Sequence, residues 1–133
     1  MKRIILLVFL FSISFPVATE AELREGFVYL KDIDRTIKTD VRYNTSNNFV
    51  GKKVAGYHAN KIVITEEAAE ALKEIQANLK KEGLGLKVFD AYRPRKAVDH
   101  FVKWAKDRKD LRTKKKYYPD VPKSELVGGG YIS

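Results

Sequence analysis

The segment Asp90-Ala91-Tyr92-Arg93-Pro94 concentrates polar side chains that can do chemistry. It follows an alternating apolar run typical of a strand, and side chains at the end of a strand often line a cleft. The planar guanidinium of Arg93 can donate a fork of hydrogen bonds to a carboxylate or to a developing oxyanion. Asp90 could orient that guanidinium or bind a substrate ammonium group, and Tyr92 carries a phenolic donor. An ordinary Asp–Arg ion pair at a turn remains the simpler alternative.

Residue types that ligate metals are scarce. The chain has no cysteine and two histidines, His58 and His100. Neither histidine belongs to a His-Glu-x-x-His motif or to a comparably tight ligand spacing. We therefore expect His58 in a loop, His100 on a helix surface, and no metal site in this chain. The lack of cysteine also excludes a disulfide framework, thiol catalysis and cysteine-ligated clusters.

Positive charge dominates the sequence and gathers in residues 103–123. The 133-residue chain has a formal charge of +9, which favours anionic partners such as nucleic acid, a membrane face or an acidic wall polymer. A solvated surface is the simplest interpretation of the basic tract. Adhesion to anionic wall polymer or lipid comes second. Nucleic-acid binding comes last, because no phosphate loop or stacking-aromatic motif accompanies the charge.

The first 21 residues have the layout of a secretory signal peptide. Lys2 and Arg3 precede an apolar run, Pro16 interrupts it, and small residues lead to a cleavage site after Ala21. The run of about 12 to 14 residues is shorter than the roughly 20 needed to span a bilayer. We expect cleavage, a secreted or periplasmic product and no stable membrane span. An uncleaved anchor or a buried strand is the alternative.

Apolar periodicity predicts a single α+β domain over residues 22–133, with a small mixed or antiparallel sheet and flanking helices. Alternating or β-branched runs predict short strands. A glycine run followed by Tyr131-Ile132 resembles the approach to another strand, so we expect the sheet to be incomplete at its C-terminal end. The expected strands cover residues 27–30, 37–43, 61–64 and 84–89.

Two helices are expected. The first covers residues 66–81, with Thr65 as N-cap and Gly83 closing its C-terminus. The second covers residues 95–106, directly after the Asp90–Pro94 loop. Each carries an apolar stripe at helical spacing. The stripes are Ala68, Leu72, Ile75 and Leu79 in the first helix, and Val98, Phe101, Trp104 and Ala105 in the second.

Several segments, taken together, resemble the VanX-type D-alanyl-D-alanine dipeptidases, a zinc peptidase family that also contains D,D-carboxypeptidases. The most specific are an Asn-Asn-Phe-x-Gly loop and an Asp-x-Tyr-Arg-Pro loop, in that order with a helix between them. The resemblance extends over the whole mature chain. The matching segments are residues 41–51, 56–57, 67–79, 83–86, 90–94, 97–98 with Phe101 and Trp104, 118–119, and 130–132.

The resemblance implies a mechanism and a substrate. In the family, zinc held by two histidines and an aspartate activates water, and a glutamate acts as general base. The substrate is the D-Ala-D-Ala dipeptide or a related peptidoglycan fragment. The family's oxyanion-stabilising arginine corresponds to Arg93. Tyr43 and Asp90 correspond to positions that line the substrate pocket.

The sequence also departs from the family. There, Gly-Tyr-Ile is followed by Ser-x-His-x-x-Gly-x-Ala-x-Asp, which carries two zinc ligands, and later by Glu-x-x-His. Neither motif occurs in these 133 residues, and His58 and His100 match neither ligand position. We therefore expect the N-terminal part of a dipeptidase-like domain, a truncated form that lacks the metal site and is inactive alone.

Two other functions stay open. A non-catalytic protein could adhere to anionic cell-wall polymer, with Arg93 holding only a terminal carboxylate. A D,D-carboxypeptidase of the same zinc family would differ in the length of its substrate. The residues of the Asn-Asn-Phe and Asp-Ala-Tyr-Arg-Pro segments favour the dipeptidase.

Overall fold

The computed structural model describes residues 23–132, so the predicted signal peptide lies outside the described residues. The predicted α+β class, with small sheets and flanking helices, is confirmed. Its elements are β1 (Phe27–Tyr29), α1 (Leu30–Ile33), β2 (Lys38–Thr39), a 3₁₀ turn (Arg42–Asn44), β3 (Val63–Thr65), α2 (Glu66–Lys81), β4 (Lys87–Val88), α3 (Arg95–Lys106), α4 (Lys114–Tyr117) and α5 (Glu125–Gly128).

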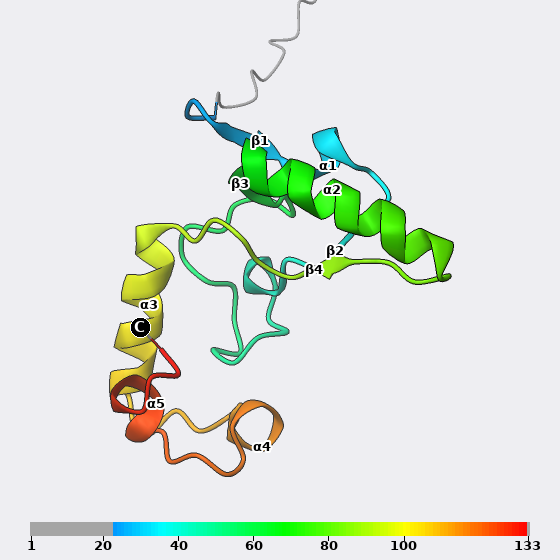
Figure 1. Cartoon of the computed structure of the whole chain (residues 1–133). Coiled ribbons are helices and arrows are strands. Elements are labelled where there is room, and N and C mark those ends of the chain that lie inside the picture. The colour runs from blue at the N-terminus through cyan, green and yellow to red at the C-terminus, as the bar shows by residue number, and fades with distance from the viewer. Residues whose placement is uncertain (1–22, 133) are drawn as a thin grey trace, which may run out of the picture.

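The strands form two separate two-stranded ladders. β1 pairs antiparallel with β3, and β2 pairs parallel with β4. Helix α2 packs along β1 and β3, whereas α3 lies apart from it beside α5, and the long connection between β2 and β3 runs between these two parts (Figure 1). Within the described residues, no helix combines the length and apolar composition required to cross a bilayer.

The strand expected over residues 37–43 ends after Thr39. Ile37 and Val41 are buried as the alternation predicted. The chain then turns, because the backbone N–H of Arg42 bonds the Asp40 carbonyl at 2.8 Å. The resulting 3₁₀ turn carries Tyr43 to α3, where its ring centroid lies 5.0 Å from that of Phe101.

Helix α2 begins and ends as its sequence predicts. The Thr65 side chain accepts a hydrogen bond from the Ala68 N–H at the N-terminus. Gly83 follows the C-terminus with a φ of +73°, a left-handed conformation that glycine adopts without steric cost.

The apolar stripe predicted for α2 is partly wrong. Ile75 is 48% exposed, whereas Ala69 and Gln76 are the buried residues of this helix. The Gln76 amide accepts from the Leu86 N–H at 2.7 Å and donates to the Thr36 hydroxyl at 3.1 Å. A polar side chain occupies the buried position because it satisfies donors and acceptors of two neighbouring segments.

The stripe predicted for α3 is largely confirmed, since Phe101, Trp104 and Ala105 are buried. Aromatic rings continue from this helix in both directions. Phe49 lies 4.9 Å from Phe101 and 5.2 Å from Trp104, and Tyr118 lies 5.7 Å from Trp104, between ring centroids. Such pairs each contribute roughly 0.5–1.5 kcal/mol beyond burial, so they join the central loop to the C-terminal segment.

The strand predicted over residues 84–89 is shorter in the structure, and Tyr131-Ile132 does not lead into a strand within the described residues. β4 covers only Lys87–Val88, and Leu84 is 60% exposed. The chain folds back on α5, where the Ile132 N–H donates to the Leu126 carbonyl at 2.8 Å. Ile132 thus bonds the end of a helix instead of a strand, and within residues 23–132 no strand follows β4.

Candidate functional site

The loop after β4 holds Asp90 and Arg93 in one fixed arrangement. The Tyr92 N–H donates to the carbonyl of Val63 in β3 at 2.9 Å and ties the loop to the neighbouring ladder. Arg93 donates from Nε and Nη2 to the same oxygen, Oδ2 of Asp90, at 3.2 and 3.0 Å. The carboxylate therefore holds the guanidinium through Nε and Nη2, and Arg93 also interacts with the Tyr57 hydroxyl.

The Arg93 guanidinium lies over two aromatic rings. Its Cζ is 5.2 Å from the Phe101 ring centroid and 5.5 Å from that of Tyr43, both within cation–π range. Burial disfavours the charge, but hydrogen bonding and attraction to Asp90 outweigh it and raise the pKa of Arg93. The side chain remains 39% exposed. A permanent cation is thus held at the surface and is accessible from one side.

Tyr57 approaches the same carboxylate from a different segment. Its hydroxyl donates to Oδ1 of Asp90 at 2.8 Å, and the residue is buried. Burial, followed by the hydrogen bond and charge of Asp90, raises the pKa of Tyr57 and outweighs the opposing hydrogen bond and charge of Arg93. Gly56, with a φ of +89°, allows the segment that carries Tyr57 to lie close to Pro94, because a Cβ at residue 56 would be 2.9 Å from the Pro94 Cβ.

The structure brings together the three residues singled out by the sequence, Tyr43, Asp90 and Arg93; their roles stay predictions. A hollow of about 230 Å³ lies beside the loop and is lined in part by Tyr57, Tyr92 and Pro94.

Sequence reasoning did not assign two residues to the site. Residues 56–57 belong to the segments that carry the family resemblance, but nothing local gave Tyr57 a role, because its partner Asp90 is 33 residues away. Phe101 was placed in the apolar stripe of its helix, where it is indeed buried. A helical stripe indicates burial, but not that one ring also supports a guanidinium.

The Asn-Asn-Phe-x-Gly segment packs against the two rings next to Arg93, because Phe49 contacts both Tyr43 and Phe101. The buried Asn48 amide donates to the carbonyls of Arg42, Thr45 and Lys52, at 3.2, 2.7 and 2.9 Å. Its Oδ1 accepts from the N–H groups of residues 50 and 51. One side chain thus closes the loop that carries Tyr43 and Phe49, so the motif has a structural reason in this chain.

We expect Asn48→Ala to lower the free energy of unfolding by about 1–3 kcal/mol, because buried donors and acceptors lose their partners. Urea unfolding followed by the fluorescence of Trp104, the single tryptophan, measures it. The control is Asn47→Ala, an exposed neighbour that accepts from Lys116 and Tyr117 and should change stability by less than about 0.5 kcal/mol. Equal losses in both variants would contradict the assigned role of Asn48.

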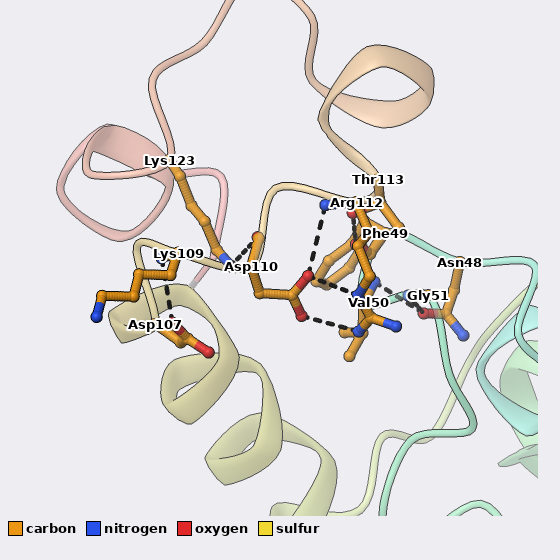
Figure 2. A network of polar contacts seen from close by, with 10 residues as sticks. All are labelled: Asn48, Phe49, Val50, Gly51, Asp107, Lys109, Asp110, Arg112, Thr113 and Lys123. Atoms are coloured by element: carbon orange, nitrogen blue, oxygen red, sulfur yellow. Dashed lines mark hydrogen bonds and ion pairs between the residues drawn. The ribbon is translucent and has the colours of Figure 1, made fainter.

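The segment after α3 docks onto this loop, as Figure 2 shows. The Thr113 hydroxyl donates to the Phe49 carbonyl. Asp110 accepts from Arg112 Nε and Nη2 at 2.8 and 2.9 Å, and this hydrogen bonding lowers the pKa of Asp110 to about 2. The Thr113 bond therefore attaches residues 110–113 to the loop that carries Phe49, while the Asp110–Arg112 pair holds the segment itself together.

Part of the basic tract is structural rather than solvated. Lys123 is buried, and its Nζ lies 3.9 Å from the Trp104 ring centroid. The same Nζ donates to the Asp110 carbonyl at 2.6 Å (Figure 2). Lys114 donates to the carbonyls of residues 118, 119 and 121. These ammonium groups satisfy backbone oxygens, so they are not available to an external polyanion.

The described residues do not fit a zinc site. His58 is exposed in a loop, as predicted. His100 is half-buried rather than fully on the surface: its Nδ1 accepts from the Ala55 N–H at 3.0 Å, and burial, then Lys52 and Lys103, lower its pKa. Within residues 23–132, no three His, Asp or Glu side chains are grouped closely enough to hold a metal ion.

Comparison with known proteins identifies the family. Residues 23–129 match the peptidase M15 family model, described as D-ala-D-ala dipeptidase. This chain therefore belongs to the peptidase M15 family, as the sequence resemblance predicted.

Three relatives carry the name D-alanyl-D-alanine dipeptidase. The protein from Enterococcus faecalis is 40% identical over 111 residues, which cover 84% of this chain and 55% of the relative. The protein from Enterococcus faecium is 39% identical, over 81% of this chain and 54% of the relative. That from Streptomyces coelicolor is 38% identical, over 80% and 53%. The chain thus spans about half the length of these relatives.

Proposed function

We propose that this chain carries the substrate-orienting part of a D-Ala-D-Ala dipeptidase site, in which Arg93 binds an anionic oxygen of the dipeptide. The observation that carries the proposal is the guanidinium held by Asp90 over the rings of Tyr43 and Phe101. Family membership and the names of the relatives support the substrate.

The chemistry of the site follows from the exposed part of the guanidinium. Asp90 accepts from Nε and Nη2, and N–H groups on the exposed part of the guanidinium can donate to a carboxylate or to the oxygen of a tetrahedral intermediate. Such donors accelerate a reaction when they are aimed in advance at the place where charge develops. Here the Asp90 carboxylate and the rings of Tyr43 and Phe101 hold the guanidinium in place before a ligand binds.

An NMR titration tests whether the chain binds this ligand. We expect D-Ala-D-Ala to shift the Arg93 Nε–H resonance and the backbone resonances of residues 90–94. The exposed Arg95, which pairs with Asp99, serves as an internal reference that should not move. Shifts confined to the basic residues of the 103–123 tract would favour a wall-polymer-binding protein instead, and no shift at Arg93 would reject the proposal.

Hydrolysis by the family uses zinc, and we propose that this chain cannot supply the ligands alone, since His58 and His100 are its two histidines. Purified chain incubated with zinc and D-Ala-D-Ala should release no D-alanine in a coupled D-amino-acid oxidase assay. Metal analysis after dialysis should find no equimolar zinc. The Enterococcus faecalis relative serves as the positive control. Zinc-dependent turnover that a chelator abolishes would contradict this prediction.

We also propose export of the chain, on the layout of residues 1–21. The mature N-terminus should then be Glu22. Mass spectrometry of protein from the periplasm or medium of an expressing bacterium measures this. A product that keeps Met1 and stays with the membrane fraction would instead indicate an uncleaved anchor.

A further inference from the structure

Tyr57 is buried against the candidate site without belonging to the loop that carries Arg93. We propose that Tyr57 is a positioning residue: its hydroxyl fixes the Asp90 carboxylate, which in turn fixes the orientation of the Arg93 guanidinium. This inference rests on the proposed function, because it concerns how the arginine is aimed at the dipeptide.

The two oxygens of Asp90 have different partners. Oδ1 accepts from the Tyr57 hydroxyl at 2.8 Å, and Oδ2 accepts from Arg93 Nε and Nη2 at 3.2 and 3.0 Å. Rotation of the carboxylate would disturb both sets of bonds at once. Removing the hydroxyl frees one oxygen, so the carboxylate can turn and carry the guanidinium with it.

Tyr57 is rigid enough for this task. It is 7% exposed, and its ring centroid lies 5.4 Å from that of Tyr43. Its N–H donates to the Val54 carbonyl at 3.3 Å, and Gly56 brings this loop against Pro94. Arg93, in contrast, is a long side chain with an exposed edge. The buried tyrosine therefore orders the exposed arginine through the Asp90 carboxylate and through its own contact with Arg93.

The protonation state of Tyr57 suits its role as a hydrogen-bond donor to Asp90. Its raised pKa, caused first by burial and then by the hydrogen bond to Asp90, keeps the phenol neutral. A neutral phenol can donate, whereas a phenolate beside Asp90 would repel it. Tyr57 should therefore remain a donor to Asp90 at neutral pH.

The Tyr57→Phe variant of the full chain tests the inference, because it removes the hydroxyl and keeps the ring. We expect NMR relaxation to show a lower order parameter for the Arg93 Nε–H bond, with or without ligand. We also expect affinity for D-Ala-D-Ala to fall about five- to tenfold. Tyr29→Phe, at another wall of the neighbouring hollow, is the matched control and should change neither quantity. Thermal unfolding of all variants verifies that they are folded.

A double-mutant cycle separates positioning from general packing. If Tyr57 acts through Asp90 and Arg93, Tyr57→Phe should weaken binding in the unmodified chain and have no further effect in Arg93→Ala. An equal loss in both backgrounds, or an unchanged order parameter for the Arg93 Nε–H bond, would overturn the inference. If the unmodified chain does not bind the dipeptide, the proposed function fails, and the ligand-free relaxation measurement still decides the role of Tyr57.

Discussion

Arg93→Ala is expected to weaken binding of D-Ala-D-Ala about 10- to 100-fold. Hydrogen bonds that involve a charged group contribute roughly 1.5–3 kcal/mol each, and every 1.4 kcal/mol is a factor of ten in affinity. The guanidinium is held in advance by Asp90 and by the rings beneath it, so little of that energy is spent on ordering the side chain. Isothermal titration calorimetry or the NMR titration measures the loss.

Two control variants show whether the fork of Arg93 or only its charge is responsible. Arg93→Lys keeps the charge but cannot bond Asp90 and a ligand oxygen with one planar group, so most of the affinity should still be lost. Arg95→Ala removes a nearby, highly exposed cation and should bind like the unmodified chain. An Arg95→Ala loss equal to that of Arg93→Ala would show that binding depends on overall positive charge instead.

Gly56→Ala is expected to lower the free energy of unfolding by about 2–4 kcal/mol, through left-handed strain and overpacking together. Its φ is +89°, and the added methyl would meet Cβ of Pro94 at 2.9 Å. Proline is rigid, so the two loops must separate. That separation should also pull Tyr57 from Asp90 and reduce dipeptide binding. Urea unfolding and the NMR titration measure the two effects.

Two other glycines supply matched controls for Gly56→Ala. Gly26 also has a positive φ, of +78°, but a Cβ there meets open space, so Gly26→Ala should show the strain alone, about 1–2 kcal/mol. Gly128 in α5 has neither feature, and alanine there should leave stability unchanged or raise it slightly. A Gly56→Ala loss no larger than that of Gly26→Ala would contradict a tight approach to Pro94.

The helices show how far local sequence reasoning reaches. The start of α2 at Thr65 and its end before Gly83 were both predicted, because caps act over three or four residues. The buried face of α2 was predicted less well, since Ile75 is exposed and Gln76 is buried. Which face a helix buries depends on the segments beneath it, and those lie elsewhere in the chain.

The strands show where local sequence reasoning fails. Alternation predicted a strand over residues 37–43, yet β2 covers only Lys38–Thr39. Alternation reports which side chains face the core, and Ile37 and Val41 are indeed buried. A strand also needs a partner for its backbone, and β4 offers one over only two residues. Pairing partners are set by the tertiary structure.

The sequence by itself determined the α+β class, the main helices and the family, because short motifs and local periodicity carry that information. Through the resemblance it also singled out Arg93, Asp90 and Tyr43, whose roles stay predictions. Only the tertiary structure decided that Arg93 lies over Tyr43 and Phe101 and that Tyr57 bonds Asp90. These contacts join segments tens of residues apart, and no local pattern specifies which distant side chain will meet a given carboxylate. Asn48 holds the loop around it by bonding backbone carbonyls, and Gly56 lets the following segment lie against Pro94.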